Sequence, residues 1–282
     1  MTVSARDRVL ISPGELMTRL AGGERPVILD VRWRLDATDG RDAFSEGHIP
    51  GAVYVSLEDE LSDHRISGRG RHPLPTGSDL QRAARRWGID NGQSVIVYDD
   101  WNRAGSARAW WVLTAAGLPD VRILDGGLAQ WLAAGGDLQR GDSNPAPGNV
   151  SFAHADLYTG ARATLTADEI AAGTLGTVLD ARAPERFRGD TEPVDPVAGH
   201  IPGAVNVPST SVLADGGAFL DDDALRSRFA DLSGEVGVYC GSGVTAAVLL
   251  AGLAAAGIDG ALFPGSWSQW CAEAGRATAT GD

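Results

Sequence analysis

A cysteine inside a short glycine-rich segment is the strongest candidate for chemistry in this 282-residue chain. Cys240 follows the apolar run VGVY and begins the sequence CGSGVTA, after which a segment of helical period starts. Gly241 and Gly243 let the backbone curl so that successive N–H groups face one point, and the helix adds the positive end of its dipole. Such a ring of amides stabilises a thiolate, which is the nucleophilic form of cysteine. We therefore predict that Cys240 is a nucleophile, rather than merely a small buried apolar residue.

The predicted catalytic turn covers six consecutive residues, in which two hydroxyl groups add hydrogen-bond donors without adding charge. These residues are Cys240, Gly241, Ser242, Gly243, Val244 and Thr245. In a parallel sheet, the crevice beyond the carboxyl ends of the strands is where ligands bind. The turn is therefore expected to open into such a crevice.

The elements around this turn occur twice in the chain. Residues 47–55 and 199–207 share the block GHIPGAV. Each copy is preceded by an apolar run that ends in the pattern Asp-x-Arg; the two runs are VILDVR and TVLDAR. Each is followed by a run ending in Tyr, then an Ala-rich segment, then the related stretches ILDGGLAQW and LFPGSWSQW. The alignment of the copies puts Asp99 where Cys240 stands. The pattern predicts two tandem copies of one fold.

Short β-branched runs alternate with helical segments in each copy, which is typical of an α/β fold with a parallel sheet flanked by helices. We predict a first domain over residues 8–138 and a second, catalytic domain over residues 164–277. The intervening residues 139–163 are rich in Gly, Asn, Pro, Ala and Ser, which predicts a linker.

The repeated GHIPGAV, the CGSGVTA turn and the paired closing Trp segments resemble the two-domain rhodanese superfamily, and most closely the 3-mercaptopyruvate sulfurtransferases. The resemblance covers nearly the whole chain. It implies two rhodanese-like domains, of which the first is inactive, since Asp99 replaces the cysteine. It also implies a sulfurtransferase that moves sulfane sulfur from 3-mercaptopyruvate, through a Cys240 persulfide, to a thiol acceptor such as thioredoxin or to cyanide.

The same resemblance implies roles for residues outside the turn. Arg186 corresponds to a substrate-facing arginine of the family, and Arg188 is the alternative candidate for this role. A guanidinium group can bind a small anion through two parallel hydrogen bonds. Asp180 and Arg182 are similar to residues that brace the active loop.

Two further residues are possible assistants of the cysteine. His48 is similar to a histidine proposed to act with an acid, which could be Asp36, Asp39 or Asp42. However, His200 holds the same place in the second copy, which favours a structural role for both histidines. Arg108 could supply positive potential to a cleft between the domains.

The sequence leaves two candidates for the sulfur donor, 3-mercaptopyruvate and thiosulfate. The family's second arginine, about nine residues beyond the first, is replaced by Asp195 in TEPVDP, which weakens the case for a carboxylate donor. Thiosulfate-preferring rhodaneses, in contrast, usually carry basic residues inside the loop, and CGSGVTA has none. We expect 3-mercaptopyruvate, with thiosulfate:cyanide sulfurtransferase as the alternative and a rhodanese-like binding module as the non-enzymatic one. Related folds with phosphatase or arsenate reductase activity carry a Cys-x5-Arg loop whose arginine binds the oxyanion, and here Ala246 stands at the arginine position.

Composition excludes several other classes. The formal net charge is −13, which repels nucleic acid and anionic lipid surfaces. All 24 basic residues are arginine, so lysine-based Schiff bases and the P-loop lysine are absent. The two cysteines form no metal-binding motif, and we expect neither a metal nor an organic cofactor. Without a signal peptide or a long apolar span, a cytoplasmic location is expected.

Overall fold

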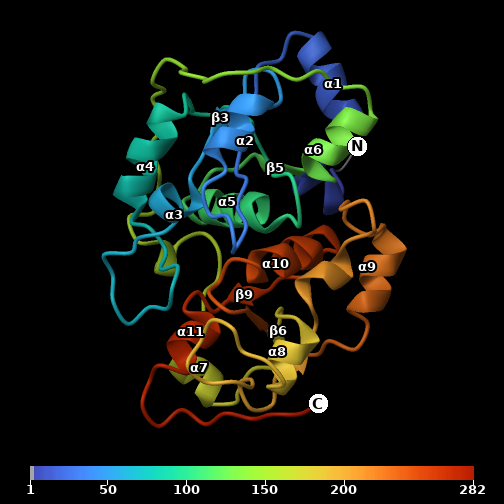
Figure 1. Cartoon of the computed structure of the whole chain (residues 1–282). Helices are drawn as coiled ribbons and strands as arrows, with labels where there is room; N and C mark the ends of the chain where they lie inside the picture. Colours follow the sequence, from blue (N-terminus) through green and yellow to red (C-terminus); the bar gives the residue numbers. More distant parts are fainter. Residues whose placement is uncertain (1–2) are drawn as a thin grey trace.

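The computed structural model describes residues 3–282, and they form two α/β units that lie one above the other in Figure 1. Each unit contains one sheet in which every strand pair is parallel. The first sheet has the order β1-β5-β4-β2-β3 and the second the order β7-β6-β8-β9. The strands of the first are β1 (Leu10–Ile11), β2 (Val27–Asp30), β3 (Val53–Tyr54), β4 (Val95–Tyr98) and β5 (Val121–Leu124). Those of the second are β6 (Thr177–Asp180), β7 (Val205–Asn206), β8 (Val236–Tyr239) and β9 (Ala261–Leu262).

Helices cover the sheets in both units. In the first unit they are η1 (Arg6–Arg8), α1 (Pro13–Ala21), α2 (Arg41–Glu46), α3 (Leu57–Glu60), α4 (Gly77–Arg86), α5 (Ala104–Ala115) and α6 (Gly127–Ala133). In the second they are α7 (Ala167–Ala171), α8 (Pro184–Arg188), η3 (Ser209–Val212), α9 (Asp222–Arg228), α10 (Ala246–Ala255) and α11 (Ser266–Trp270). This is the α/β organisation that the alternating pattern predicts.

The repeated GHIPGAV block has a structural function in both units. The N–H of Ile49 donates to the hydroxyl of Tyr98 at 3.1 Å, and the N–H of Ile201 donates to the hydroxyl of Tyr239 at 3.1 Å. Each tyrosine is the last residue of a central strand. The block therefore docks onto the strand whose carboxyl end leads into the functional turn.

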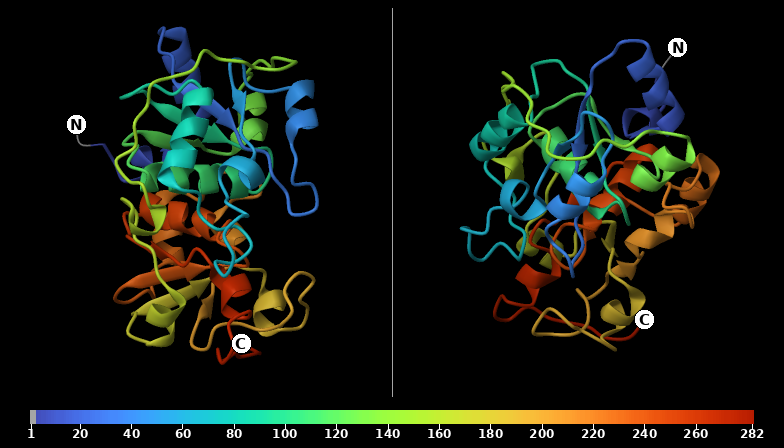
Figure 2. Two further views of the ribbon diagram at one scale, coloured as in Figure 1. Left: turned by 90° about the vertical axis from the view of Figure 1, so that its left-hand side faces the viewer. Right: turned by 45° about the horizontal axis from the view of Figure 1, so that its top comes forward.

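The two helices that follow the central strands, α5 and α10, pack against each other where the units meet (Figures 1 and 2). Nearly every residue of each helix is buried; α10 is apolar throughout, and α5 is apolar apart from Ser106, Arg108 and Thr114. A helix that is apolar on all sides must be enclosed by protein. The small Ala and Gly side chains on both helices suit a close approach, so this pair fixes the position of one unit relative to the other.

Residues 139–163 follow the surface of the first unit. The N–H of Gly148 donates to the carbonyl of Arg85 at 2.8 Å, and that of Val150 donates to the carbonyl of Ile89 at 3.1 Å. The short helix η2 (Leu157–Thr159) lies near the end of this segment. Within residues 3–282, no helix combines the length and the apolar character that crossing a membrane requires.

Candidate active site

Cys240 follows directly after β8, at the edge where the parallel strands of the second sheet end. Its side chain is buried. Its Sγ atom accepts a hydrogen bond from the N–H of Gly243 at 3.1 Å, and its own N–H donates to Ser266 Oγ at 3.2 Å. Among residues 3–282, the Gly243 amide is the one loop amide within hydrogen-bond distance of the sulfur, where the sequence predicts several. The first turn of α10 begins at Ala246, close behind the loop.

The path of the turn depends on Gly243. Its φ angle is +78°, a conformation that residues with a side chain rarely adopt. A Cβ atom at this position would also stand 2.5 Å from the carbonyl oxygen of Pro264. Both constraints require glycine, and together they direct the Gly243 N–H toward the sulfur.

The equivalent turn of the first unit holds a carboxylate. Asp99 Oδ1 accepts hydrogen bonds from the N–H groups of Trp101 at 3.1 Å and Arg103 at 3.2 Å. Its Oδ2 accepts from the N–H of Ser106 at 3.0 Å and from its hydroxyl at 2.6 Å. The turn that follows the central strand is thus an anion-binding turn in the first copy, and Asp99 fills it permanently.

Ser242 is connected to two side chains of the first unit that the sequence did not single out. Its Oγ atom lies 2.7 Å from Nδ1 of His72, and Nε2 of His72 lies 3.2 Å from Glu58 Oε1. Because a carboxylate only accepts hydrogen bonds, the proton of a neutral His72 is on Nε2, and Nδ1 accepts from the Ser242 hydroxyl. Burial lowers the pKa of His72, against the raising effect of Glu58. The ring is therefore neutral near pH 7.

Glu58 is held as a carboxylate by three N–H donors. Burial would raise the pKa of Glu58, but the hydrogen bonds and charges around it outweigh burial and lower the pKa to about 2. Besides His72, the donors are Nε1 of Trp33 at 2.6 Å and Nε2 of His64 at 2.9 Å. The chain Ser242–His72–Glu58 has the order of donor, acceptor and orienting carboxylate that activates hydroxyl groups in enzymes.

His48 lies away from this arrangement. It is buried in the first unit, where its Nδ1–H donates to the carbonyl of Phe44 at 2.9 Å and its ring stacks on the Phe44 ring. His200 makes the same contacts with Phe187 in the second unit, at 2.8 Å. His48 does not line the cleft around Cys240. The position near the turn that the sequence suggested for His48 is occupied by His72.

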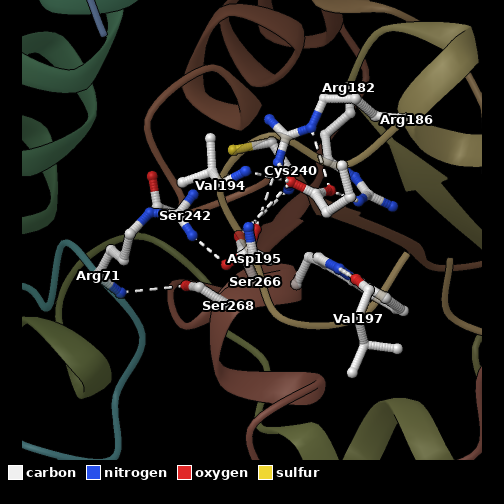
Figure 3. A network of polar contacts seen from close by, with 12 residues as sticks. Arg71, Arg182, Arg186, Val194, Asp195, Val197, Cys240, Ser242, Ser266 and Ser268 are labelled. Carbon is white, nitrogen blue, oxygen red and sulfur yellow. Dashed lines mark hydrogen bonds and ion pairs between the residues drawn. The ribbon is translucent and has the colours of Figure 1, made fainter. Parts of the chain in front are cut away.

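Two guanidinium groups from different units converge beside Cys240. Arg186, in the middle of α8, donates to Glu192 Oε1 at 2.6 Å and to Asp195 Oδ2 at 3.2 Å. Arg71, from the first unit, also pairs with Asp195 (Figure 3). A Cβ atom on Gly241 would lie 3.0 Å from Nη2 of Arg71 and 3.5 Å from Nη1 of Arg186. Both arginines therefore face the loop.

The rival Arg188 has a different environment. It pairs with Asp190 on the protein surface at 2.8 Å, and it is not among the residues that line the cleft. The geometry thus favours Arg186 over Arg188 as the donor-facing residue of α8.

Arg108 is fully buried and connects the two units. It donates to the carbonyls of Leu61 at 3.1 Å and His72 at 3.0 Å in the first unit, and to the carbonyl of Gly243 at 3.2 Å in the turn. Burial lowers the pKa of Arg108 to about 10. It therefore ties the segment around His72 to the Cys240 turn from behind, instead of lining the cleft.

Asp180 and Arg182 stabilise the floor of the site. Arg182 grips the buried Asp180 carboxylate, with Nη2 at 2.6 Å from Oδ2, and also donates to the carbonyl of Gly199 at 2.7 Å. The pair thus connects the end of β6 with the GHIPGAV block. Their contacts brace the strand ends beneath the loop and do not include a hydrogen bond to residues 240–245 within the described part of the chain.

Cys240, Arg71 and Arg186 line a cleft of about 340 Å³ between the units. Its wall contains residues from both units and four residues of the turn besides Cys240: Trp33, Leu35, Arg71, Trp101, Asn102, Ala181, Arg182, Ala183, Pro184, Arg186, Pro208, Ser209, Thr210, Gly241, Ser242, Val244 and Thr245. A buried sulfur at the base of a cleft with two inward-facing guanidinium groups suits a small anionic substrate.

Sequence reasoning did not identify Arg71, His72 or Glu58. The adjacent Arg and His in GRGRHPLP are a weak signal, since nothing nearby indicates that this loop reaches the other unit. His72 and Ser242 are 170 residues apart in the chain. Their contact depends on how the units pack.

Comparison with known proteins agrees with this architecture. The sequence matches the rhodanese-like domain family at residues 12–134 and again at 163–273. It is 60% identical to a Mycobacterium tuberculosis protein named "Putative thiosulfate sulfurtransferase SseB", over 99% of both chains. It is 34% identical to the human 3-mercaptopyruvate sulfurtransferase, over 93% of this chain and 92% of the human protein.

The fold also matches solved structures. The crystal structure of SseA from Escherichia coli, described as a 3-mercaptopyruvate sulfotransferase, superposes with a TM-score of 0.79 and 31% identity, over 92% of this chain and 98% of SseA. The family match covers both copies of the repeat, and the relatives span nearly the full length. The chain therefore belongs to the rhodanese-like family, with two such domains in tandem, and it is a sulfurtransferase.

Proposed function

We propose that the enzyme takes sulfane sulfur from 3-mercaptopyruvate, holds it as a persulfide on Cys240, and passes it to a thiol such as thioredoxin or to cyanide. The observation that carries this proposal is the hydrogen-bonded chain Ser242–His72–Glu58 beside the sulfur. It supplies a polarised hydroxyl, which a keto donor needs and thiosulfate does not.

The first step is attack of the Cys240 thiolate on the sulfur of the donor. The new S–S bond forms as the S–CH₂ bond breaks, and the electron pair of the broken bond goes to the leaving group as the enolate of pyruvate. A proton then converts the enolate to pyruvate. Negative charge develops on the former ketone oxygen, so a hydroxyl directed at that oxygen stabilises the transition state.

Ser242 is suited to this role because His72 and Glu58 orient it. His72 accepts from the hydroxyl at 2.7 Å and is neutral, so the Ser242 proton can be shared toward the ring or toward a substrate oxygen. The Glu58 carboxylate keeps the single ring N–H proton of His72 on Nε2. This is general acid–base geometry, in which a buried ring is fixed in one tautomer.

The carboxylate of the donor is assigned to Arg71 and Arg186. Both guanidinium groups face Gly241, next to the nucleophile. A planar carboxylate can accept N–H bonds from both, which would orient the donor sulfur toward Cys240.

The second step returns the enzyme to its starting state. An acceptor thiolate or cyanide attacks the outer sulfur of the persulfide, and the Cys240 thiolate is the leaving group. This is a ping-pong scheme, in which Cys240 alternates between two covalent forms. It requires a cysteine that stays reduced between turnovers, which suits the cytoplasm.

Thiosulfate is the second candidate donor, because the 60% identical relative carries that name. In its reaction the Cys240 thiolate attacks the outer sulfur, and the S–S bond electrons depart with sulfite. No enolate forms, so Ser242 and His72 would have no developing oxyanion to stabilise.

Steady-state kinetics with both donors and cyanide as the acceptor test the proposal. We expect a higher kcat/KM for 3-mercaptopyruvate than for thiosulfate, and a clear reversal would contradict it. Intact mass after incubation with 3-mercaptopyruvate should show a gain of one sulfur, which Cys240→Ser abolishes while Cys271→Ser retains it. Absence of the adduct with both donors would refute the persulfide itself.

A further inference from the structure

Asp195 lies in an unusual position for an acidic residue, directly behind two arginines that line the cleft. Its side chain is 4% exposed, and its carboxylate lies between the guanidinium groups of Arg71 and Arg186 (Figure 3). The backbone N–H of Asp195 donates to Glu192 Oε1 at 3.0 Å, which fixes the residue from the other side. Asp195 thus connects arginines that belong to different units.

Each arginine contacts Asp195 through one terminal nitrogen and also lies against the loop at Gly241. Arg71 pairs with Asp195 through Nη1 and faces Gly241 with Nη2. Arg186 pairs with Asp195 through Nη2, and its Nη1 and Nη2 atoms would lie 3.5 and 3.7 Å from a Cβ atom on Gly241. Asp195 therefore stands behind the two guanidinium groups, and the space beside Gly241 is left to a substrate anion. The carboxylate neither contacts the reacting sulfur nor blocks the cleft.

The charges around this point balance before any donor arrives. Arg71 and Arg186 contribute two positive charges, and Glu192 and Asp195 contribute two negative ones. Arg182 pairs with Asp180 and also contacts Glu192 at 3.4 Å, so Arg182 and Asp180 together add one charge of each sign. Burial raises the pKa of Asp195, with a further raising effect from Glu192, and the two arginines oppose this rise. The two arginines thus offer N–H donors to a substrate while the net charge of the group is zero. The Cys240 sulfur beside them reacts as an anion.

A balanced site treats donors of different charge differently. A monoanion gains the directed hydrogen bonds and meets a modest repulsion from Asp195 and the thiolate. A dianion meets twice the Coulomb repulsion from each of those charges. The difference between the donors depends on the charge of Asp195, since its position behind the arginines leaves the hydrogen-bond donors on the cleft side unchanged.

We propose that Asp195 is a specificity-determining residue, which restricts the cleft to singly charged sulfur donors by cancelling part of the positive charge of Arg71 and Arg186. This inference rests on the proposed function, since it assumes that these arginines bind the donor. Asp195 does not touch the reacting atoms and acts through the two guanidinium groups.

Asp195→Asn tests the inference, because it removes the charge and keeps the size and one acceptor oxygen. The KM for 3-mercaptopyruvate should fall on the order of tenfold and the KM for thiosulfate on the order of a hundredfold, because the Coulomb energy doubles with the charge of the donor. The ratio of the two KM values should therefore change about tenfold in favour of thiosulfate. Asp195→Glu, which retains the charge, should keep the wild-type ratio.

Asp190→Asn is the matched control. Asp190 carries the same charge five residues away, but it is exposed and pairs with Arg188 outside the cleft. Its removal should leave the KM ratio unchanged. If Asp195→Asn raises both KM values by the same factor, or leaves their ratio as in the wild type, Asp195 merely supports the arginines and the inference is overturned.

The inference can also be tested on the wild-type protein, so that the result does not depend on whether a variant folds. Pyruvate, a monoanion, should protect Cys240 from alkylation by iodoacetamide at a lower concentration than sulfate, a dianion. Stronger protection by sulfate would overturn the inference. Intact mass separates the two hypotheses: if neither donor loads Cys240, the proposed function fails and the inference with it, whereas normal loading with an unchanged KM ratio overturns the inference alone.

Discussion

Ser242→Ala should separate the reactions of the two donors within one active site. The hydroxyl lies 2.7 Å from His72 Nδ1, and both residues are buried, with 6% and 5% of their surfaces exposed. Loss of one preorganised donor to a developing oxyanion in such a site costs on the order of a hundredfold to a thousandfold in kcat. We expect a loss of this size for 3-mercaptopyruvate. Turnover of thiosulfate should change only a few-fold, since its transition state has no enolate oxygen.

The assay is steady-state cyanide sulfuration with each donor, which makes thiosulfate an internal control for folding and for the Cys240 nucleophile. Because Ser242 and His72 act as one unit, the double variant Ser242→Ala/His72→Asn should be little slower than Ser242→Ala alone. Equal losses with the two donors would refute the reasoning, because they would place Ser242 in a step common to both, such as orienting the loop. Additive losses in the double variant would show that the two residues act separately.

Three further outcomes follow from the geometry. Arg186→Ala should raise the KM for 3-mercaptopyruvate more than it lowers kcat, because the arginine is assigned to ground-state binding; an unchanged KM in steady-state assays would remove it from the donor site. In denaturant unfolding, Gly243→Ala should lower the free energy of unfolding by about 1–3 kcal/mol more than Gly68→Ala does. Gly68 has a similar φ of +75° with open space around it, whereas a Cβ atom at Gly243 would also clash with the Pro264 carbonyl. Equal losses in the two variants would show that small shifts of the backbone relieve this clash. An NMR titration should place the His72 pKa below the ordinary value of 6.5, because burial disfavours the charged ring, and lower still in Glu58→Gln, which removes the charge that raises it. A His72 pKa above 6.5, or an upward shift in that variant, would contradict this account of the pair.

Much of the fold was predictable from local patterns. The apolar runs that became β2, β4, β6 and β8 are followed by turn residues and helical segments, and these are properties of neighbouring residues. The repeated block indicated that the pattern is used twice. Its role as a dock for the strand-end tyrosines Tyr98 and Tyr239 could not be inferred, because those hydrogen bonds join residues that are distant in the sequence.

The turn that holds Cys240, the proposed nucleophile, could be predicted for the same reason. The glycine that shapes the turn, Gly243, is three residues from Cys240, and its amide is the one that contacts the sulfur. The role of His48 could not be resolved in this way, since only its buried contact with Phe44 distinguishes a structural histidine from an assisting one.

The sequence by itself determined the two copies, the turn and the lone sulfur, because each is encoded by residues that are adjacent in the chain. Only the tertiary structure decided what surrounds that sulfur. The packing of α5 against α10 brings the loop with Arg71 and His72 over the Cys240 turn, and Arg108 ties that loop to Gly243. The contacts of Ser242 with His72 and of Asp195 with Arg71 cross the interface between the units, so no local pattern in either copy could have specified them.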